Sequence, residues 1–120
     1  MSLIVLLFRT TGHQVLIIHP RIKWGKEKQH MYKAEHMTGE AVALVESIPN
    51  WRVVDTMIVS VERSRKKKTV FGPGQIDGIV GRLKHDRQIT AIFLNLDMLT
   101  GAQHIELCLH WKLPIFDRTL

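Results

Sequence analysis

The sequence predicts an α/β fold: a small, open, mostly parallel four-stranded sheet built from βαβ units with flanking helices. Apolar runs of strand length alternate with segments of about a dozen residues, many of helical periodicity, and this alternation favours right-handed βαβ crossovers. Residues 91–96 are apolar at almost every position, as is typical of a parallel strand buried on both faces. A chain of 120 residues, 45% of them hydrophobic, accommodates one domain with a single core.

Residues 1–12 are predicted to form an apolar N-terminal extension, and residues 13–120 the single domain. The apolar run in the extension is far shorter than the ~20 residues that span a bilayer. It also lacks the basic segment and the small-residue cleavage site of a secretory signal. We therefore expect no membrane among the partners.

The first half of the domain is predicted to hold two strands and a helix. The first strand covers residues 13–19 and ends at Pro20, because proline cannot donate to a sheet ladder. A basic connector follows over residues 20–35, and a helix begins at Thr38, where apolar residues recur at spacings of three and four. Residues 51–61 are rich in β-branched side chains and predict the second strand.

The second half is predicted to alternate helices with two further strands. A short extended piece is expected at residues 69–71, and residues 91–96 and 114–116 predict the third and fourth strands. Before the third strand, helical spacing relates four apolar residues, Ile76, Ile79, Val80 and Leu83. After it, a helix is expected to bury one face made of Ile105, Cys108 and Leu109.

The positive charge of the chain is concentrated in its first half. The net charge is +6, and the first 68 residues hold twelve basic and six acidic residues, whereas the remainder holds five of each. The cations cluster in residues 21–33 and in residues 63–68. This asymmetry favours a polyanionic partner, and nucleic acid over a membrane, because no segment pairs the cations with an amphipathic apolar face. The alternative for residues 63–68 is a solvated surface loop.

A glycine-bracketed turn, Gly72-Pro73-Gly74-Gln75, follows the second cluster. A turn that leads into a helix N-terminus presents backbone N–H groups, which bind anions. The phosphate-loop motif G-x-x-x-x-G-K-[ST] occurs nowhere in the sequence. We therefore expect no GTPase activity from these residues, and we do not expect this chain to be an enzyme. The turn is best interpreted as the tight entry to the second helix, and a small ATP or GTP site is the alternative.

The histidines and the cysteine predict neither a metal site nor a catalytic site. His104 and Cys108 are four residues apart on the third helix, but His110 lies about 240° around that helix from His104, so the three cannot share an ion. Cys108 is expected to act as a small buried hydrophobe. Either Asp97 or Thr100 is expected to cap the helix.

Two aromatic residues lie among the cations of the connector. Trp24 and Tyr32 suit stacking on bases, as in proteins that bind single-stranded nucleic acid. Trp24 could equally anchor the connector to the domain. Trp51, by contrast, is expected to pack in the core.

Four short motifs follow one another along the chain: Val54-Asp55-Thr56, Phe71-Gly72-x-Gly74, Phe93-Leu94-Asn95-x-Asp97-x-Leu99-Thr100-x-x-Gln103, and Phe116-Asp117-Arg118. In order and spacing they resemble the N-terminal domain of the HflX family of ribosome-associated GTPases. Ile22-Lys23-Trp24-Gly25 and residues 40–45 add a similarity to the animal mitochondrial branch of that family. Pro73 and Gln75 stand where the family usually has lysines.

The resemblance implies a non-catalytic module that binds ribosomal RNA, in a protein that acts in ribosome subunit splitting, recycling or biogenesis. A linked GTPase domain is the second expected partner, and GTP and Mg²⁺ are expected only with that domain. A scaffold that regulates the linked GTPase is a further alternative. The implied location is the mitochondrial matrix, with the cytoplasm as the alternative. The residues expected to contact RNA are Arg63, Arg65, Lys66, Lys67, Lys68, Gly72, Gly74 and Gln75, with Arg21, Lys23, Lys26 and Lys28.

Overall fold

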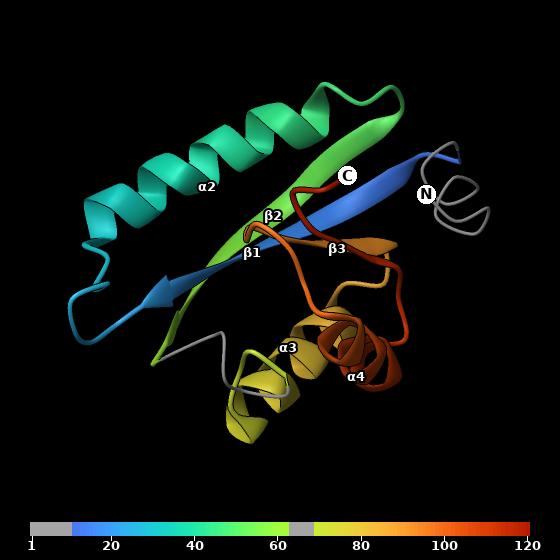
Figure 1. The fold of residues 1–120 in the computed structure, drawn as a ribbon. Helices are drawn as coiled ribbons and strands as arrows, with labels where there is room; N and C mark the ends of the chain where they lie inside the picture. The colour runs from blue at the N-terminus through green and yellow to red at the C-terminus, as the bar shows by residue number, and fades with distance from the viewer. Residues whose placement is uncertain (1–10, 63–68) are drawn as a thin grey trace.

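The computed structural model describes residues 11–62 and 69–120, which form a four-stranded sheet with helices on both faces (Figure 1). All strand pairs are parallel, in the order β2-β1-β3-β4, and this confirms the predicted α/β class. The strands are β1 (His13–Ile22), β2 (Trp51–Val61), β3 (Ala91–Leu94) and β4 (Ile115–Phe116). The helices are α2 (Met31–Glu46), α3 (Pro73–His85) and α4 (Gly101–Trp111).

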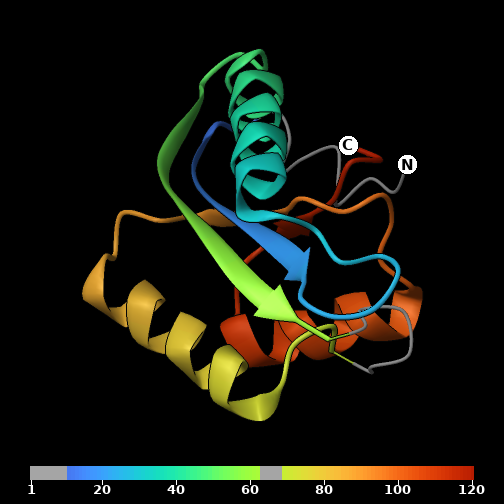
Figure 2. The ribbon, with the colours of Figure 1, turned by 90° about the vertical axis from the view of Figure 1, so that its left-hand side faces the viewer.

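The sheet is the middle of three layers, with α2 on one face and α3 and α4 on the other (Figure 2). Successive side chains of a strand point to opposite faces, so β1 contributes to two separate cores. Val15 and Ile17 join the core under α2, whereas Leu16 and Ile18 join the core under α3 and α4. All four side chains are fully buried, which explains why this strand is apolar at successive positions.

β1 continues past its predicted end, so the boundary at Pro20 was wrong. The carbonyl of Ile18 accepts a hydrogen bond from the N–H of Asn95, on the β3 side of the strand. The backbone of Pro20, two residues on, faces the same side, but β3 has already ended at Leu94. The missing N–H of Pro20 therefore costs no ladder bond, and β1 runs on beside β2 to Ile22.

α2 begins at Met31, seven residues before the predicted start, and the connector shrinks to residues 23–30. The buried stripe of this helix consists of Ala34, Thr38, Ala41 and Val45. Thr38 can be buried because its hydroxyl donates to the carbonyl of Ala34 at 2.7 Å. A small residue and a threonine thus extend the stripe into a segment that has few large apolar side chains.

α4 exists as predicted, but the face assigned to the core was wrong. Ile105 and Leu109 are 62% and 66% exposed, and Cys108 is only partly buried. The buried residues are instead Gln103, Leu107 and Trp111. Apolar side chains occur on both sides of this helix, so the spacing alone could not select the side that packs on the sheet.

Two shorter segments also differ from their predictions. β3 ends at Leu94 rather than at residue 96, because the N–H of Leu96 turns back to the carbonyl of Leu94. Residues 69–71 form no strand. Val70 has a φ of 69°, a left-handed conformation that is costly for a β-branched residue and that bends the chain towards α3.

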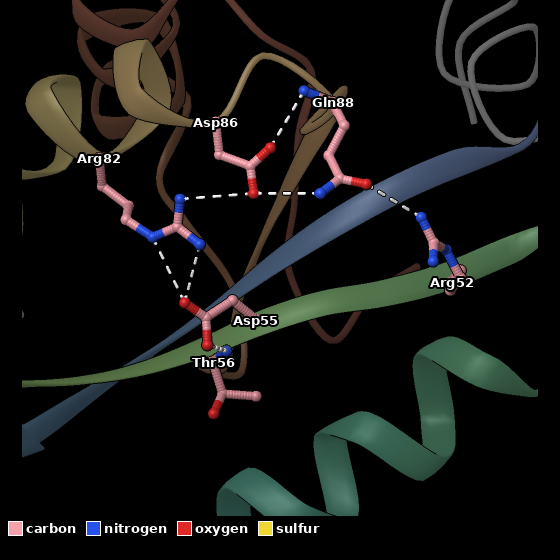
Figure 3. A network of polar contacts seen from close by, with 6 residues as sticks. All are labelled: Arg52, Asp55, Thr56, Arg82, Asp86 and Gln88. Carbon is pink, nitrogen blue, oxygen red and sulfur yellow. Dashed lines mark hydrogen bonds and ion pairs between the residues drawn. The ribbon is translucent and has the colours of Figure 1, made fainter.

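A polar network fixes α3 to the edge strand β2 (Figure 3). The guanidinium of Arg82 on α3 donates to Oδ2 of Asp55 on β2, through Nη2 at 2.9 Å and Nε at 3.3 Å. Nη1 of Arg82 lies 3.6 Å from Oδ2 of Asp86. Gln88 continues the network, because it donates to Asp86 and accepts from Arg52. Hydrogen bonds from Arg82 hold the pKa of Asp55 below its ordinary value.

Candidate nucleic-acid interface

The strands that precede the two cationic segments in the sequence end side by side. β1 and β2 are parallel neighbours, and Ile22 pairs with Val61 at the last position of their register. The N–H of Lys23 donates to the carbonyl of Val61 at 2.8 Å, so the first loop residue is still attached to β2. The loop of residues 23–30, which we call the cationic loop, therefore starts beside the point from which the chain continues towards residues 63–68.

Ser60 of β2 joins this point to the glycine turn. Its hydroxyl accepts a hydrogen bond from Nη1 of Arg21 at 2.9 Å, and its carbonyl accepts one from Nε2 of Gln75 at 2.6 Å. Arg21 belongs to β1 and Gln75 to the first turn of α3. One serine thus holds together two groups of predicted site residues that are more than fifty positions apart in the sequence.

The cationic loop is closed at its base by Gln29. The N–H of Gln29 donates to the carbonyl of Ile22 at 2.8 Å, and its own carbonyl accepts from Nε of Arg21 at 2.8 Å. Its side chain bonds to His19 and to the sulfur of Met37. Hydrogen bonds from the backbone and from both ends of the side chain therefore fix Gln29 near the end of the loop, and residues 23–28 project from this braced base.

His19 anchors this base in the interior. Its ring is 1% exposed, and Nδ1 accepts a hydrogen bond from Nδ2 of Asn95 at 2.9 Å. Nε2 must then carry the proton, which it donates to Oε1 of Gln29. Burial is the main reason that the pKa of His19 is lowered, and the positive charge of Arg118 acts in the same direction. The imidazole is therefore neutral at pH 7 and serves as a fixed bridge between β1, β3 and the loop.

Asn95 connects this bridge to the C-terminal segment. Its Oδ1 accepts from Nε of Arg118 at 2.9 Å, and Nη1 of Arg118 pairs with Asp97 at 2.8 Å. Asp117 accepts from the N–H of Leu99 at 2.8 Å. The polar residues of the third and fourth motifs therefore bond to one another, and this places the chain after β4 against the end of β3.

A pocket of about 370 Å³ opens beside this network, between α2 and the residues that follow β3 and β4. It is lined by Met37, Glu40, Ala41, Leu44, Asn95 and Arg118. The carboxyl ends of parallel strands are common places for ligand sites. Asn95 and two nitrogens of Arg118 are already used within the protein, so the network itself explains the polar groups here.

The charges of the cationic loop are directed to solvent. Lys23, Lys26 and Lys28 are all exposed, as is Lys33 on the first turn of α2, and Glu27 is the single acidic residue among them. Arg21 differs from these lysines, because its guanidinium braces Gln29 and Ser60. The surface that can meet a phosphate backbone is thus the row of loop lysines, whereas Arg21 supports the loop from behind.

The other residues predicted to contact RNA divide into two groups. Arg63, Arg65, Lys66, Lys67 and Lys68 lie outside the described residues. The glycine turn is the entry to α3, as predicted, with Gly72 as the N-cap and Gly74 inside the first turn. Both ends of the Gln75 side chain are used internally, because Oε1 accepts from the N–H of Gly72 and Nε2 donates to Ser60.

Sequence reasoning missed Gln29 and Ser60, the two residues that organise this surface. Neither belongs to a charged or aromatic pattern, and both act through backbone groups as well as through their side chains. Only the register that pairs β1 with β2 could have placed Ser60 beside Arg21. Asn95, by contrast, belongs to a motif quoted from the sequence and directly follows the apolar strand β3.

No metal or nucleophilic centre appears in the part of the chain that the structure describes. No three His, Cys, Asp or Glu side chains gather there to hold an ion. His104 lies 3.9 Å from Cys108, but its Nε2 also bonds to the carbonyl of Ile115, and His110 pairs with Glu106. Burial raises the pKa of the Cys108 thiol, which disfavours the reactive thiolate. Likewise, no helix within residues 11–62 and 69–120 is long and apolar enough to cross a membrane.

Comparison with known proteins shows which sequences this chain is similar to. Three curated relatives, each named "Putative GTP-binding protein 6", are similar to this chain. The protein of Xenopus laevis is 41% identical over 107 residues, that of Homo sapiens 35% over 105, and that of Mus musculus 32% over 105. This chain resembles one segment of a GTP-binding protein. No family model matches the sequence.

The matches cover only part of each relative, and this limits which functions of the relatives can be assigned to this chain. They cover 88% to 89% of this chain but 20% of each relative. The chain thus spans about a fifth of the length of the relatives it matches, and its sequence contains no phosphate-loop motif. The relatives therefore support a module associated with a GTP-binding protein, and they assign no GTP site to these residues.

Proposed function

We propose that this chain is the N-terminal RNA-binding module of an HflX-like GTP-binding protein, and that it contacts ribosomal RNA through the cationic loop. The observation that carries the proposal is the braced loop at the carboxyl ends of β1 and β2. It presents Lys23, Lys26 and Lys28 to solvent beside the end of β2, the strand that precedes the second basic segment in the sequence. Clustered lysines on a fixed base bind a phosphate backbone and release its counterions. The motifs that resemble the HflX family add the ribosome as the source of that RNA.

The nucleotide-binding alternative has less support. The turn that opens α3 has a proline at its first helical position, which has no N–H to offer. The N–H groups of Gly72 and Gln75 are bonded to Gln75 Oε1 and to the Gly72 carbonyl. The turn thus uses most of the groups that a phosphate would need. Calorimetry with ATP and GTP tests this point, and we expect no heat of binding up to millimolar nucleotide.

The central test is the salt dependence of binding to ribosomal subunits. A triple change, Lys23→Ala/Lys26→Ala/Lys28→Ala, is expected to weaken binding by about tenfold or more at low salt, because three cations no longer meet phosphates. It should also flatten the plot of log affinity against log salt by about two units, since each phosphate that a lysine neutralises adds roughly 0.7 to 0.9 to that slope. Filter binding between about 50 and 300 mM salt measures both quantities.

A control variant that removes the same charge is available at the opposite end of the strands. Lys84, Arg87 and Lys112 are exposed. Lys84 lies in the last turn of α3, Arg87 follows that helix before β3, and Lys112 follows α4 before β4. Changing these three to alanine removes the same charge and is expected to leave affinity within about twofold, because only long-range attraction is removed. Equal weakening by both triple variants would show attraction without a defined surface. Unchanged binding of the loop variant would remove the loop from the interface.

A further inference from the structure

Trp24 stands apart from the other tryptophans of the chain. It is 62% exposed, whereas Trp51 and Trp111 are 5% and 4% exposed. Trp51 packs in the core as expected, in contact with His13 and Phe116. Trp24 lies on the cationic loop, next to Gly25, whose φ of 86° requires the freedom of glycine. Its exposure means that it does not anchor the loop to the domain, so this large ring is available to a partner.

A second exposed ring flanks the same loop. Tyr32 is 74% exposed in the first turn of α2, and its ring is stacked on that of His30, with the planes inclined by 12° and the centroids 5.8 Å apart. The stack limits the freedom of the tyrosine without burying it. A ring that is already ordered loses less entropy when a further flat group stacks on it.

Cations surround both rings. Nζ of Lys23 lies 5.5 Å from the centroid of the Trp24 ring, and Lys26, Lys28 and Lys33 are exposed nearby in the sequence. Exposed aromatic rings between lysines are the combination by which proteins hold unpaired nucleotides, because the rings stack on bases while the ammonium groups meet phosphates. Bases inside a duplex cannot offer their faces in this way.

We propose that Trp24 and Tyr32 stack on unpaired bases of RNA, so that the cationic loop selects single-stranded or looped-out nucleotides over duplex. This inference rests on the proposed function, since it specifies the form of RNA that the same loop binds. The bracing of Gln29 by His19, Arg21 and Ile22 supplies the rigid base that such stacking needs.

The exposure difference among the tryptophans supplies the test. Because Trp51 and Trp111 are buried, quenching of the intrinsic fluorescence by an added oligonucleotide reports chiefly on Trp24. We expect a single-stranded RNA of about 12 nucleotides to quench the emission and a blunt duplex of about 12 base pairs, which has no unpaired bases, to quench it weakly. Trp24→Leu and Tyr32→Leu are each expected to reduce affinity for the single strand roughly five- to hundredfold, whereas Trp24→Phe keeps most of it.

Two controls separate this inference from the proposed function. Ile105→Ala and Leu109→Ala remove equally exposed apolar groups from α4 and should leave affinity unchanged. The leucine variants should also keep the salt dependence of the original chain, which the triple lysine variant loses. Equal affinity for the single strand and the blunt duplex, or full affinity in both leucine variants, would overturn the stacking while lysine-dependent binding stands. Loss of RNA binding by the unaltered chain would overturn both.

Discussion

His19 braces the candidate interface, and its protonation state affects how stable the folded chain is at acidic pH. Because its pKa is lowered, the unfolded chain takes up a proton before the folded one as pH falls. The contribution of neutral His19 is therefore complete above about pH 6.5 and declines as pH falls from there towards its lowered pKa. Protonation would also remove the acceptor at Nδ1 that Asn95 uses.

We accordingly expect the free energy of unfolding to decrease between about pH 7 and pH 5, measured by urea titration at several pH values. His19→Gln should lower stability at pH 7 and flatten that decrease. His36→Gln removes an exposed histidine that pairs with Glu40, and it should keep the decrease seen in the original chain. A pH profile that His19→Gln leaves unchanged would assign the acid sensitivity to other groups.

At the scale of single elements, helix ends show how far local sequence determines structure. Thr100 caps α4 as one of the two predicted candidates, because its Oγ1 accepts from the N–H of Gln103 at 3.1 Å. The side chain of Gln103 accepts in return from the N–H of Thr100 at 3.0 Å. Asp97, the other candidate, pairs with Arg118 instead. Both cap residues lie within one turn of sequence, which is why the pattern could be recognised in advance.

Removal of this cap should destabilise the chain by a modest amount. Thr100→Ala is expected to cost about 1 kcal/mol of unfolding free energy, because it leaves an N–H of the first turn without its acceptor. Thr100→Ser keeps the hydroxyl and should cost far less. Urea denaturation of the two variants measures the difference. A serine variant as unstable as the alanine variant would attribute the effect to the missing methyl group.

At the scale of the whole molecule, the ion pair between Asp55 and Arg82 links the helical layer of α3 to the sheet edge. The pair is half exposed on the Asp55 side, so Asp55→Asn is expected to cost no more than about 1 kcal/mol. The lowered pKa of Asp55 means that this contribution is present above about pH 3.9 and is lost as pH falls below that value.

A double-mutant cycle with Asp55→Asn and Arg82→Gln measures the coupling. We expect the coupling to be favourable at pH 7 and to vanish near pH 2, and hydrogen exchange in α3 to quicken in each single variant. Additive effects at pH 7 would show that the two side chains do not stabilise one another. The Thr100→Ala variant, on another helix, should show the same loss at both pH values.

The elements of the fold could be predicted largely because their signals are local. The strand at residues 91–94 is marked by consecutive apolar residues, and α3 by apolar residues three and four apart. The start of α2 was missed because Ala34 and Thr38 carry its buried stripe, and neither is a large apolar residue. The core side of α4 was missed because Ile105 and Leu107 are both apolar, and only packing on the sheet distinguishes them.

The candidate interface could be predicted only in part. The lysines and Trp24 could be found as a basic cluster with an aromatic residue. The hydrogen bonds of Arg21 and Gln75 to Ser60 could not be predicted, because they depend on which strand lies beside each of these residues. The inference about unpaired bases depends on the exposure of Trp24. The sequence could not predict this exposure, because it depends on how the loop folds against the domain.

By itself, then, the sequence determined the α/β class, the strands and helices found in residues 11–62 and 69–120, the local caps and the charge of the first half. These features depend on residues within a turn or two of one another, where periodicity and capping act. The tertiary structure decided the strand order β2-β1-β3-β4, the buried side of α4 and the meeting of the cationic loop with Ser60 and the entry to α3. The physical reason is that the parallel strands pair residues between 23 and 76 positions apart, and no local pattern encodes which strands become neighbours.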